Sequence, residues 1–203
     1  FRATKDLDIV LCIDRIDADF ARAFWEFIKN GQYKVQESAE GKPRFYRFHK
    51  PSLNGYPVML ELFSRVPDVL ILKEGTHLTP IPVNDEISSL SAILLDEDYY
   101  GWLKSGRRLV DDLPVVGPEY LIPLKVRAWL DLNTRQGSGE KIDSRNIRKH
   151  FNDVFRLFQI LDPETEIQPP QKVTADIREF LRLLPEQQID LNAIGLRSIT
   201  IDA

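Results

Sequence analysis

The stretch that decides the fold runs FRATKDLDIVLC over residues 1–12, and it places Asp6 and Asp8 just ahead of an apolar run. Residues i and i+2 of a β-strand point to the same face, so a strand here presents both carboxylates together while the alternating apolar residues of 7–11 anchor a core. Two like charges this close repel unless a cation or a basic group lies between them. The pair suits Mg²⁺, which prefers oxygen ligands. Two acids on a solvated surface strand are the alternative.

Bulk composition is ordinary for a globular protein. The 203 residues are 43% hydrophobic and 29% charged, which is enough for one large domain or a core with a smaller helical domain. The 27 basic and 31 acidic residues give a net charge of −4, so there is no global nucleic-acid signature. Contact with a polyanion would have to come from a local patch.

Compartment and targeting signals are few. The single cysteine, Cys12, lies in the first apolar run, where we expect a small buried side chain, and one cysteine allows no internal disulfide. This fits a reducing cytoplasm. No run of 18 apolar residues predicts a membrane span, and we expect no signal peptide. Because the first residue is Phe1 and a strand follows almost at once, we expect an N-terminal segment to precede it.

Periodicity divides the chain into two parts. Alternating and apolar segments predict strands over 7–13, 45–49 and 57–63, and a helical pattern covers 18–30. These elements form a mixed α/β front part. The sequence therefore predicts an α+β fold with a mixed sheet flanked by helices, comprising a first domain over 1–117 and a helical C-terminal domain over 118–203.

The rear part is helical. We expect one helix to begin at Leu121 or Pro123 and to run to about Asn133, with a mobile loop over 135–140. Ser144 is a good N-cap for a second helix. The buried stripe of that helix is expected to contain Ile147, Phe151, Phe155 and Phe158, and a last helix covers 173–184.

A third acid, Glu61, lies in the strand segment YPVMLELF. Alternation there turns Val58, Leu60 and Leu62 to one face and Met59, Glu61 and Phe63 to the other. If this strand lies beside the first, three carboxylates converge on one edge and can hold one or two divalent cations that orient a triphosphate and activate an attacking hydroxyl. The alternative is that Glu61 pairs with Lys5 or with an arginine on a solvated face of the sheet.

Two helices carry candidate phosphate ligands. Lys125 interrupts an otherwise apolar helix, so it either snorkels to solvent or reaches into a cleft toward phosphate. On the next helix, Lys149 and Asp153 are spaced i, i+4 and could form an exposed pair. Alternatively, the cations of this helix bind the phosphates of a nucleotide or an RNA. The sequence assigns no role to His150.

Four segments in order resemble one family. RATKDLDIVL, VMLELF, LIPLKVRAWLDL and RKHFNDVFRL are similar to the nucleotidyltransferase-like AbiEii/AbiGii toxins, part of the DNA polymerase β-like nucleotidyltransferase superfamily. That family shows Arg-x-Thr-x-Asp-hydrophobic-Asp, a later strand acid, a helix with Lys-x-x-Ala, and a helix with a basic residue before an aspartate. The resemblance covers about residues 1–160 and implies a nucleotidyltransferase-like mixed sheet followed by helices.

The resemblance also implies roles for single residues. Asp6 and Asp8 would bind the catalytic Mg²⁺, and Glu61 would be the third acid, where Asp is commoner. Asp153 would help to position substrate or a basic side chain. The expected catalytic residues are thus Asp6, Asp8, Glu61 and Asp153; the expected nucleotide-binding residues are Lys125, Lys149, Arg2 and Thr4, with a structural role equally open for Arg2 and Thr4.

The implied reaction is attack by a substrate hydroxyl on the α-phosphate of an NTP, with release of pyrophosphate. We expect Mg²⁺ as cofactor, NTP as substrate, RNA as a candidate acceptor and an antitoxin protein as a candidate partner. A non-catalytic relative that binds a partner or nucleic acid, and a metal-dependent nuclease, are the alternatives. The glycine turn that grips phosphate in the superfamily would lie upstream of Phe1.

Overall fold

The computed structural model describes residues 6–12, 18–37, 43–65, 78–81 and 90–195. The chain forms two compact units, Arg2–Tyr100 and Gly101–Ala203, and each is described here by itself. The boundary lies earlier than the expected one after Gly117, because the segment leading to the helices packs with them. The Trp102 and Tyr120 rings lie 4.4 Å apart between centroids, and Trp102 Nε1 donates to the carbonyl of Tyr120.

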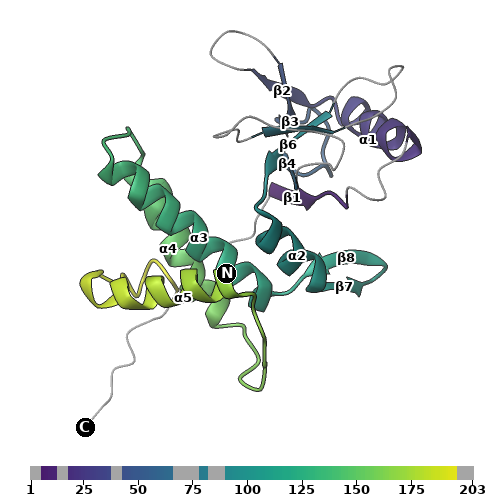
Figure 1. The fold of residues 1–203 in the computed structure, drawn as a ribbon. Coiled ribbons are helices and arrows are strands. Elements are labelled where there is room, and N and C mark those ends of the chain that lie inside the picture. Colours follow the sequence, from purple (N-terminus) through teal and green to yellow (C-terminus); the bar gives the residue numbers. More distant parts are fainter. Residues whose placement is uncertain (1–5, 13–17, 38–42, 66–77, 82–89, 196–203) are drawn as a thin grey trace. The chain divides into compact units, whose positions relative to one another are not determined.

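The first unit is built on a mixed sheet with the strand order β2-β3-β4-β6-β5 and with β1 paired to β4 (Figure 1). β1 is parallel to β4, β4 is parallel to β6, and the remaining pairs are antiparallel. This confirms the predicted α+β class with a mixed sheet. The elements are β1 (Asp6–Val10), α1 (Ala18–Asn30), β2 (Lys34–Glu37), β3 (Pro43–His49), β4 (Met59–Ser64), β5 (Leu78–Ile81), β6 (Leu90–Leu94) and the start of α2 (Glu97–Ser105).

One face of this sheet is covered by α1. Phe24 and Ile28 are one turn apart on α1, and they pack in a single buried cluster with Phe48 of β3 and with Leu60 and Leu62 of β4. Leu60 and Leu62 are 1% and 0% exposed. Burying such side chains stabilises the unit by roughly 1.5–3 kcal/mol each. The strand residues between them therefore point to the opposite face, which carries the predicted acids.

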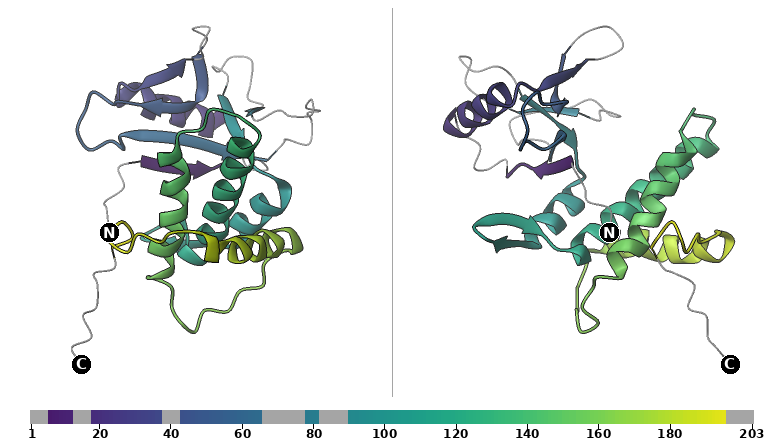
Figure 2. Two further views of the ribbon diagram at one scale, coloured as in Figure 1. Left: turned by 90° about the vertical axis from the view of Figure 1, so that its left-hand side faces the viewer. Right: turned by 180° about the vertical axis from the view of Figure 1, so that it is seen from behind.

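The second unit joins a hairpin to three helices. β7 (Arg107–Val110) and β8 (Leu113–Val116) are antiparallel, and Asp111 and Asp112 have positive φ values of 49° and 65°, as in the two-residue turns that suit hairpins. The helices are α3 (Pro118–Gly137), α4 (Ser144–Phe158) and α5 (Gln171–Leu183), followed by the 3₁₀ turn η2 (Leu184–Glu186). α3 and α4 lie side by side (Figure 2). No helix in the described residues has the length and apolarity needed to cross a bilayer.

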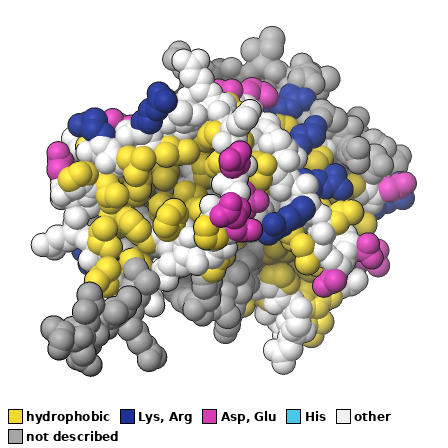
Figure 3. All heavy atoms as spheres, turned by 90° about the horizontal axis from the view of Figure 1, so that it is seen from below, with side chains coloured by type: hydrophobic (Ala, Val, Ile, Leu, Met, Phe, Trp, Pro, Cys, Tyr) yellow, Lys and Arg dark blue, Asp and Glu magenta, His cyan; other side chains and the backbone are white. Residues whose placement is uncertain are grey.

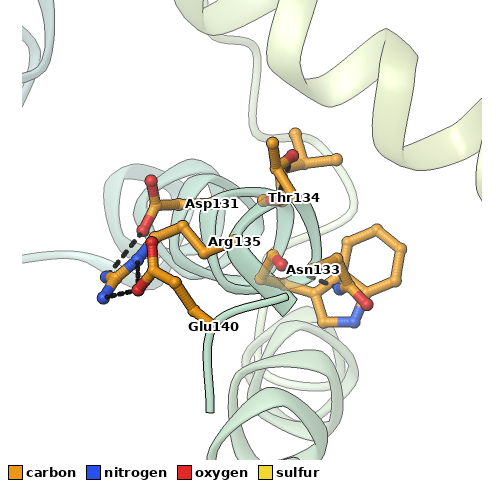
Figure 4. Close-up of polar contacts among 7 residues, drawn as sticks. Asp131, Asn133, Thr134, Arg135 and Glu140 are labelled. Atoms are coloured by element: carbon orange, nitrogen blue, oxygen red, sulfur yellow. Dashed lines mark hydrogen bonds and ion pairs between the residues drawn. The ribbon is translucent and has the colours of Figure 1, made fainter. Parts of the chain in front are cut away.

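Both ends of α3 differ from the prediction. Pro118 occupies the first turn, whereas Pro123 is buried inside the helix rather than at its start. At the other end, α3 continues through part of the expected loop to Gly137. Arg135 binds Glu140, with 2.8 Å between Nη2 and Oε2, and lies 3.5 Å from Asp131 Oδ2, so side-chain contacts hold the turn after the helix (Figure 4).

The expected start and stripe of α4 are partly wrong. The N-cap is Asp143 rather than Ser144, because Asp143 Oδ1 accepts from the backbone N–H of Arg145 at 2.9 Å. Ile147 and Phe151 are buried against α3 and α5 as predicted. Phe158, however, is 67% exposed, since the helix ends at this residue.

The second unit also leaves large apolar side chains in solvent. Leu113 is 67% exposed and Leu109 62% exposed, both on the hairpin, in addition to Phe158. Figure 3 shows one face of the molecule on which apolar side chains gather between charged ones. Exposed apolar side chains are common on folded proteins, so these residues mark the surface of the unit rather than its core.

Candidate functional site

The predicted acids of the first unit share one face of the sheet. In the parallel pair β1–β4, Asp6 lies opposite Met59 and Asp8 lies opposite Glu61. Residues paired in register across neighbouring strands point to the same face, and i, i+2 residues do so along one strand. Asp6, Asp8 and Glu61 therefore lie on the face turned away from α1. The predicted adjacency of the two strands is confirmed.

Glu61 lies between an acid and a base. β3 pairs with the other edge of β4, and Arg47 of β3 is the in-register partner of Glu61. A row of three charges thus crosses the sheet in the order Arg47, Glu61 and Asp8. Arg47 Nε donates to Glu61 Oε1 at 2.5 Å, and Nη2 makes an ion pair with the same oxygen. The alternative expectation, that an arginine pairs with Glu61, is confirmed for this structure.

Burial makes that ion pair more than a surface contact. The Glu61 side chain is 14% exposed and the Arg47 side chain 34%. A carboxylate withdrawn this far from water needs a partner, because an unpaired charge in such a position is costly. Arg47 supplies it with two N–H groups.

The carboxylates fit Mg²⁺ only in part. Among the residues that the structure describes, no group of three or more His, Cys, Asp or Glu side chains is placed to hold a metal ion. Mg²⁺ commonly binds through one or two carboxylates together with substrate phosphates. Asp6 and Asp8 are both carboxylates and lie on one face of the sheet, as this requires. One oxygen of Glu61, in contrast, is bound to Arg47.

In the second unit, the predicted residues of α3 and α4 gather around His150. The pKa of His150 is lowered to about 4, first by burial and then by the positive charges of Lys125 on α3 and of Lys149, while Asp153 acts in the opposite direction. The buried Nδ1 of His150 has no hydrogen-bond partner. His150 is therefore neutral near pH 7, under the influence of two lysines.

The i, i+4 spacing suggested an ion pair between Asp153 and Lys149, but Asp153 binds another residue. Its Oδ1 accepts from Arg156 Nη1 at 2.8 Å, and Arg156 also donates to the carbonyl of Ala193. Within the described part of the chain, neither Lys125 nor Lys149 makes an ion pair. Two lysines thus remain available for an anion near a neutral imidazole.

The other cations of α4 do not join this group. Arg145 pairs with Asp143 at 2.7 Å, and Arg148 lines a separate hollow of about 620 Å³ whose walls include Trp129, Phe151 and Asn152. The basic residues of α4 therefore have different surroundings and do not form the single basic surface that was expected.

Sequence reasoning missed Arg47 and His150. Arg47 had a signal, since it lies two residues before His49 in an alternating strand, and the two side chains therefore share one face. His150 had none, because its environment depends on Lys125 from another helix. Arg2 and Thr4 lie outside the described residues. The acids and the lysines belong to different units.

Comparisons with family models, with curated proteins and with solved structures gave no match.

Proposed function

We propose that the protein is a Mg²⁺-dependent nucleotidyltransferase that transfers NMP from an NTP to a hydroxyl acceptor. The observation that carries the proposal is the register of the parallel strands β1 and β4, which puts Asp8 opposite Glu61 with Asp6 on the same face. The resemblance in residues 1–160 supplies the reaction class. RNA is the acceptor to test first, and a toxin role with an antitoxin partner belongs to the same proposal.

The reaction forms a bond between the acceptor oxygen and the α-phosphorus and breaks the bond to pyrophosphate. A bound Mg²⁺ would neutralise phosphate charge and activate the hydroxyl. Asp6 and Asp8 provide hard oxygen ligands on one face. The resemblance assigns the triphosphate contact to Lys125 and Lys149 of the second unit, which make no ion pair within the described residues. Catalysis of this kind depends mainly on positioning and charge.

The test is incubation of the protein with each labelled NTP, Mg²⁺ and total RNA. We expect label transfer by the wild type and none by Asp8→Asn. Asp19→Asn is the matched control, since Asp19 is an exposed acid of α1 that pairs with Arg22 one turn further along the helix. Absence of transfer to RNA, protein or small acceptors would contradict the proposal. Shortening of RNA without NTP would indicate a nuclease.

A second candidate is a non-catalytic relative that binds nucleotide or nucleic acid. The ion pair between Arg47 and Glu61 favours it, because the third acid is then satisfied without a cation. Nucleotide binding that Asp8→Asn leaves intact, combined with no transfer by the wild type, would support this candidate.

A further inference from the structure

The hollow of about 620 Å³ in the second unit has no part in the proposed reaction. Its volume is within the range of roughly 300–1,000 Å³ that is typical of sites for small molecules. The exposed part of its lining includes Arg148 and Asp190. Its floor is formed by the buried lining residues Trp129, Ile147, Phe151 and Asn152.

Asn152 is the polar residue of that floor. It is 7% exposed, and its side chain makes no hydrogen bond within the described part of the chain. A buried carboxamide without a partner is costly, because both its N–H groups and its carbonyl oxygen have lost water. A ligand group that donates and accepts at once would satisfy it, and a peptide amide is such a group.

Arg148 lies one turn before Asn152 on α4, so both side chains share one face of the helix. Among the described residues Arg148 makes no ion pair, whereas Arg145 and Arg156 of the same helix each bind an aspartate. Its guanidinium is therefore available to an anionic group. The planar donors of arginine match a carboxylate in particular.

The second charge of the hollow, Asp190, is held farther along α4. Its Oδ1 accepts from the backbone N–H of Ala193 at 3.0 Å, and Arg156 donates to the carbonyl of the same residue. Arg156 is one turn beyond Asn152 and two turns beyond Arg148. In the part of the chain that the structure describes, Asp190 has no basic partner, so its second oxygen can accept from a cationic group.

The spacing of these groups selects the length of a ligand. From Arg148 to Arg156 the helix rises about 12 Å, at about 1.5 Å per residue. A free amino acid spans only about 3.5 Å, whereas three extended residues span about 10 Å. The side chains of Arg148 and Asp190 can close the remaining distance to a ligand of that length.

We propose that the hollow binds a tripeptide with free ends. Its carboxylate binds Arg148, a peptide amide pairs with the carboxamide of Asn152, and its ammonium group binds Asp190. An apolar central side chain packs against the walls formed by Trp129 and Phe151. The lining contains one cation and one carboxylate, so it matches a zwitterion better than a nucleotide or a nucleic acid, which need excess positive charge. This site is independent of the proposed nucleotidyl transfer.

Calorimetric titration of the full chain with the probe Ala-Leu-Ala tests the proposal. The N-acetyl form and the C-terminal amide of the probe each lack one charge and keep the central leucine. We expect each to bind roughly ten-fold more weakly, the value of one charge-assisted hydrogen bond. Equal binding of free and blocked peptides, or no binding at about 1 mM peptide, would overturn the inference. So would tighter binding of adenosine monophosphate, because the hollow would then recognise a base and a phosphate.

Variants assign each charge of the peptide to its residue. Arg148→Gln should weaken binding of Ala-Leu-Ala roughly ten-fold and leave binding of the C-terminal amide unchanged, since that form has no carboxylate. Asp190→Asn should have the same effect on the free peptide and none on the N-acetyl form. Arg145→Gln is the matched control on α4, because Arg145 binds Asp143 and does not line the hollow. Equal weakening of free and blocked peptides by both variants would overturn the inference.

Asn152→Ala separates a binding role from a structural one. The carboxamide of Asn152 makes no hydrogen bond within the described residues, so its removal should change the urea midpoint little. Binding of Ala-Leu-Ala should nevertheless weaken by roughly ten-fold. Unchanged peptide binding together with a large fall in the urea midpoint would show a structural role and would overturn the inference.

Discussion

The two units handle charge in opposite ways. On the sheet, Glu61 is matched by Arg47 in the same row, so the third acid is already neutralised. Between α3 and α4, Lys125 and Lys149 lie near a neutral His150, while Asp153 is taken by Arg156. The sheet therefore balances its central charge internally, whereas the helical group keeps an excess of positive charge. An excess of this kind suits an anionic ligand.

The largest effect should come from the core that holds the charged row in register. Leu62 of β4 is fully buried, so Leu62→Ala should lower the free energy of unfolding by about 2–5 kcal/mol, through lost burial and a cavity. Leu7→Ala on the neighbouring strand is the control, because Leu7 is 46% exposed and should cost about 0.5 kcal/mol. Urea unfolding measures both. Equal losses of unfolding free energy in Leu62→Ala and Leu7→Ala would show that the charged row of Arg47, Glu61 and Asp8 does not depend on this core.

A smaller effect should come from His150 in the helical group. The unfolded chain binds a proton near pH 6.5, whereas the folded protein resists doing so until about pH 4. Stability should therefore fall as the pH decreases through this window. Over this pH range the free energy of unfolding should fall by roughly 1–2 kcal/mol more in the wild type than in His150→Gln. The figure is reduced for solvent screening because the ring is only partly buried.

The same histidine reports on its neighbours. Lys125→Met removes a positive charge near the ring and should raise the pKa of His150, whereas Asp153→Asn should lower it. NMR titration of the ring resonances gives these directions. If the pKa of His150 were unchanged in Lys125→Met, the charge of Lys125 would not act on the ring. The contrast in charge between the two units would then be wrong.

The smallest effect should distinguish exposed ion pairs from the partly buried one. Arg135 pairs with Glu140 and Asp131, but its side chain is 43% exposed, so Arg135→Gln should cost about 0.5 kcal/mol or less. Arg47→Gln should cost about 1–2 kcal/mol, because it leaves Glu61 without its partner. Denaturant unfolding of the two variants would contradict this ranking if the costs were equal.

Local pattern predicted much of the fold. The helical periodicity of 18–30 corresponds to α1 with the same bounds, and the expected strands over 45–49 and 57–63 correspond to β3 and β4 within two residues at each end. Errors came where a boundary depends on a side-chain contact. Arg135 stabilises the turn after α3, and Asp143 caps α4 in place of the expected Ser144.

The candidate site was predictable only in its acids. Asp6 and Asp8 share a face because alternation along one strand is a property of the backbone. Whether Glu61 would meet a cation or an arginine depended on which strand paired with the second edge of β4. The predicted roles of Lys125, Lys149 and Asp153 remain part of the proposal.

The sequence by itself determined the spacing of the Asp6–Asp8 pair, the amphipathic helices and the alternation that isolates Glu61 on a polar face. These features follow from short-range geometry, which repeats every two or every 3.6 residues. Tertiary structure alone decided that Arg47 lies beside Glu61 and that Lys125 lies near His150. Strand pairing and helix packing join residues 14 and 25 positions apart, and the charge and hydration of each group depend on those neighbours.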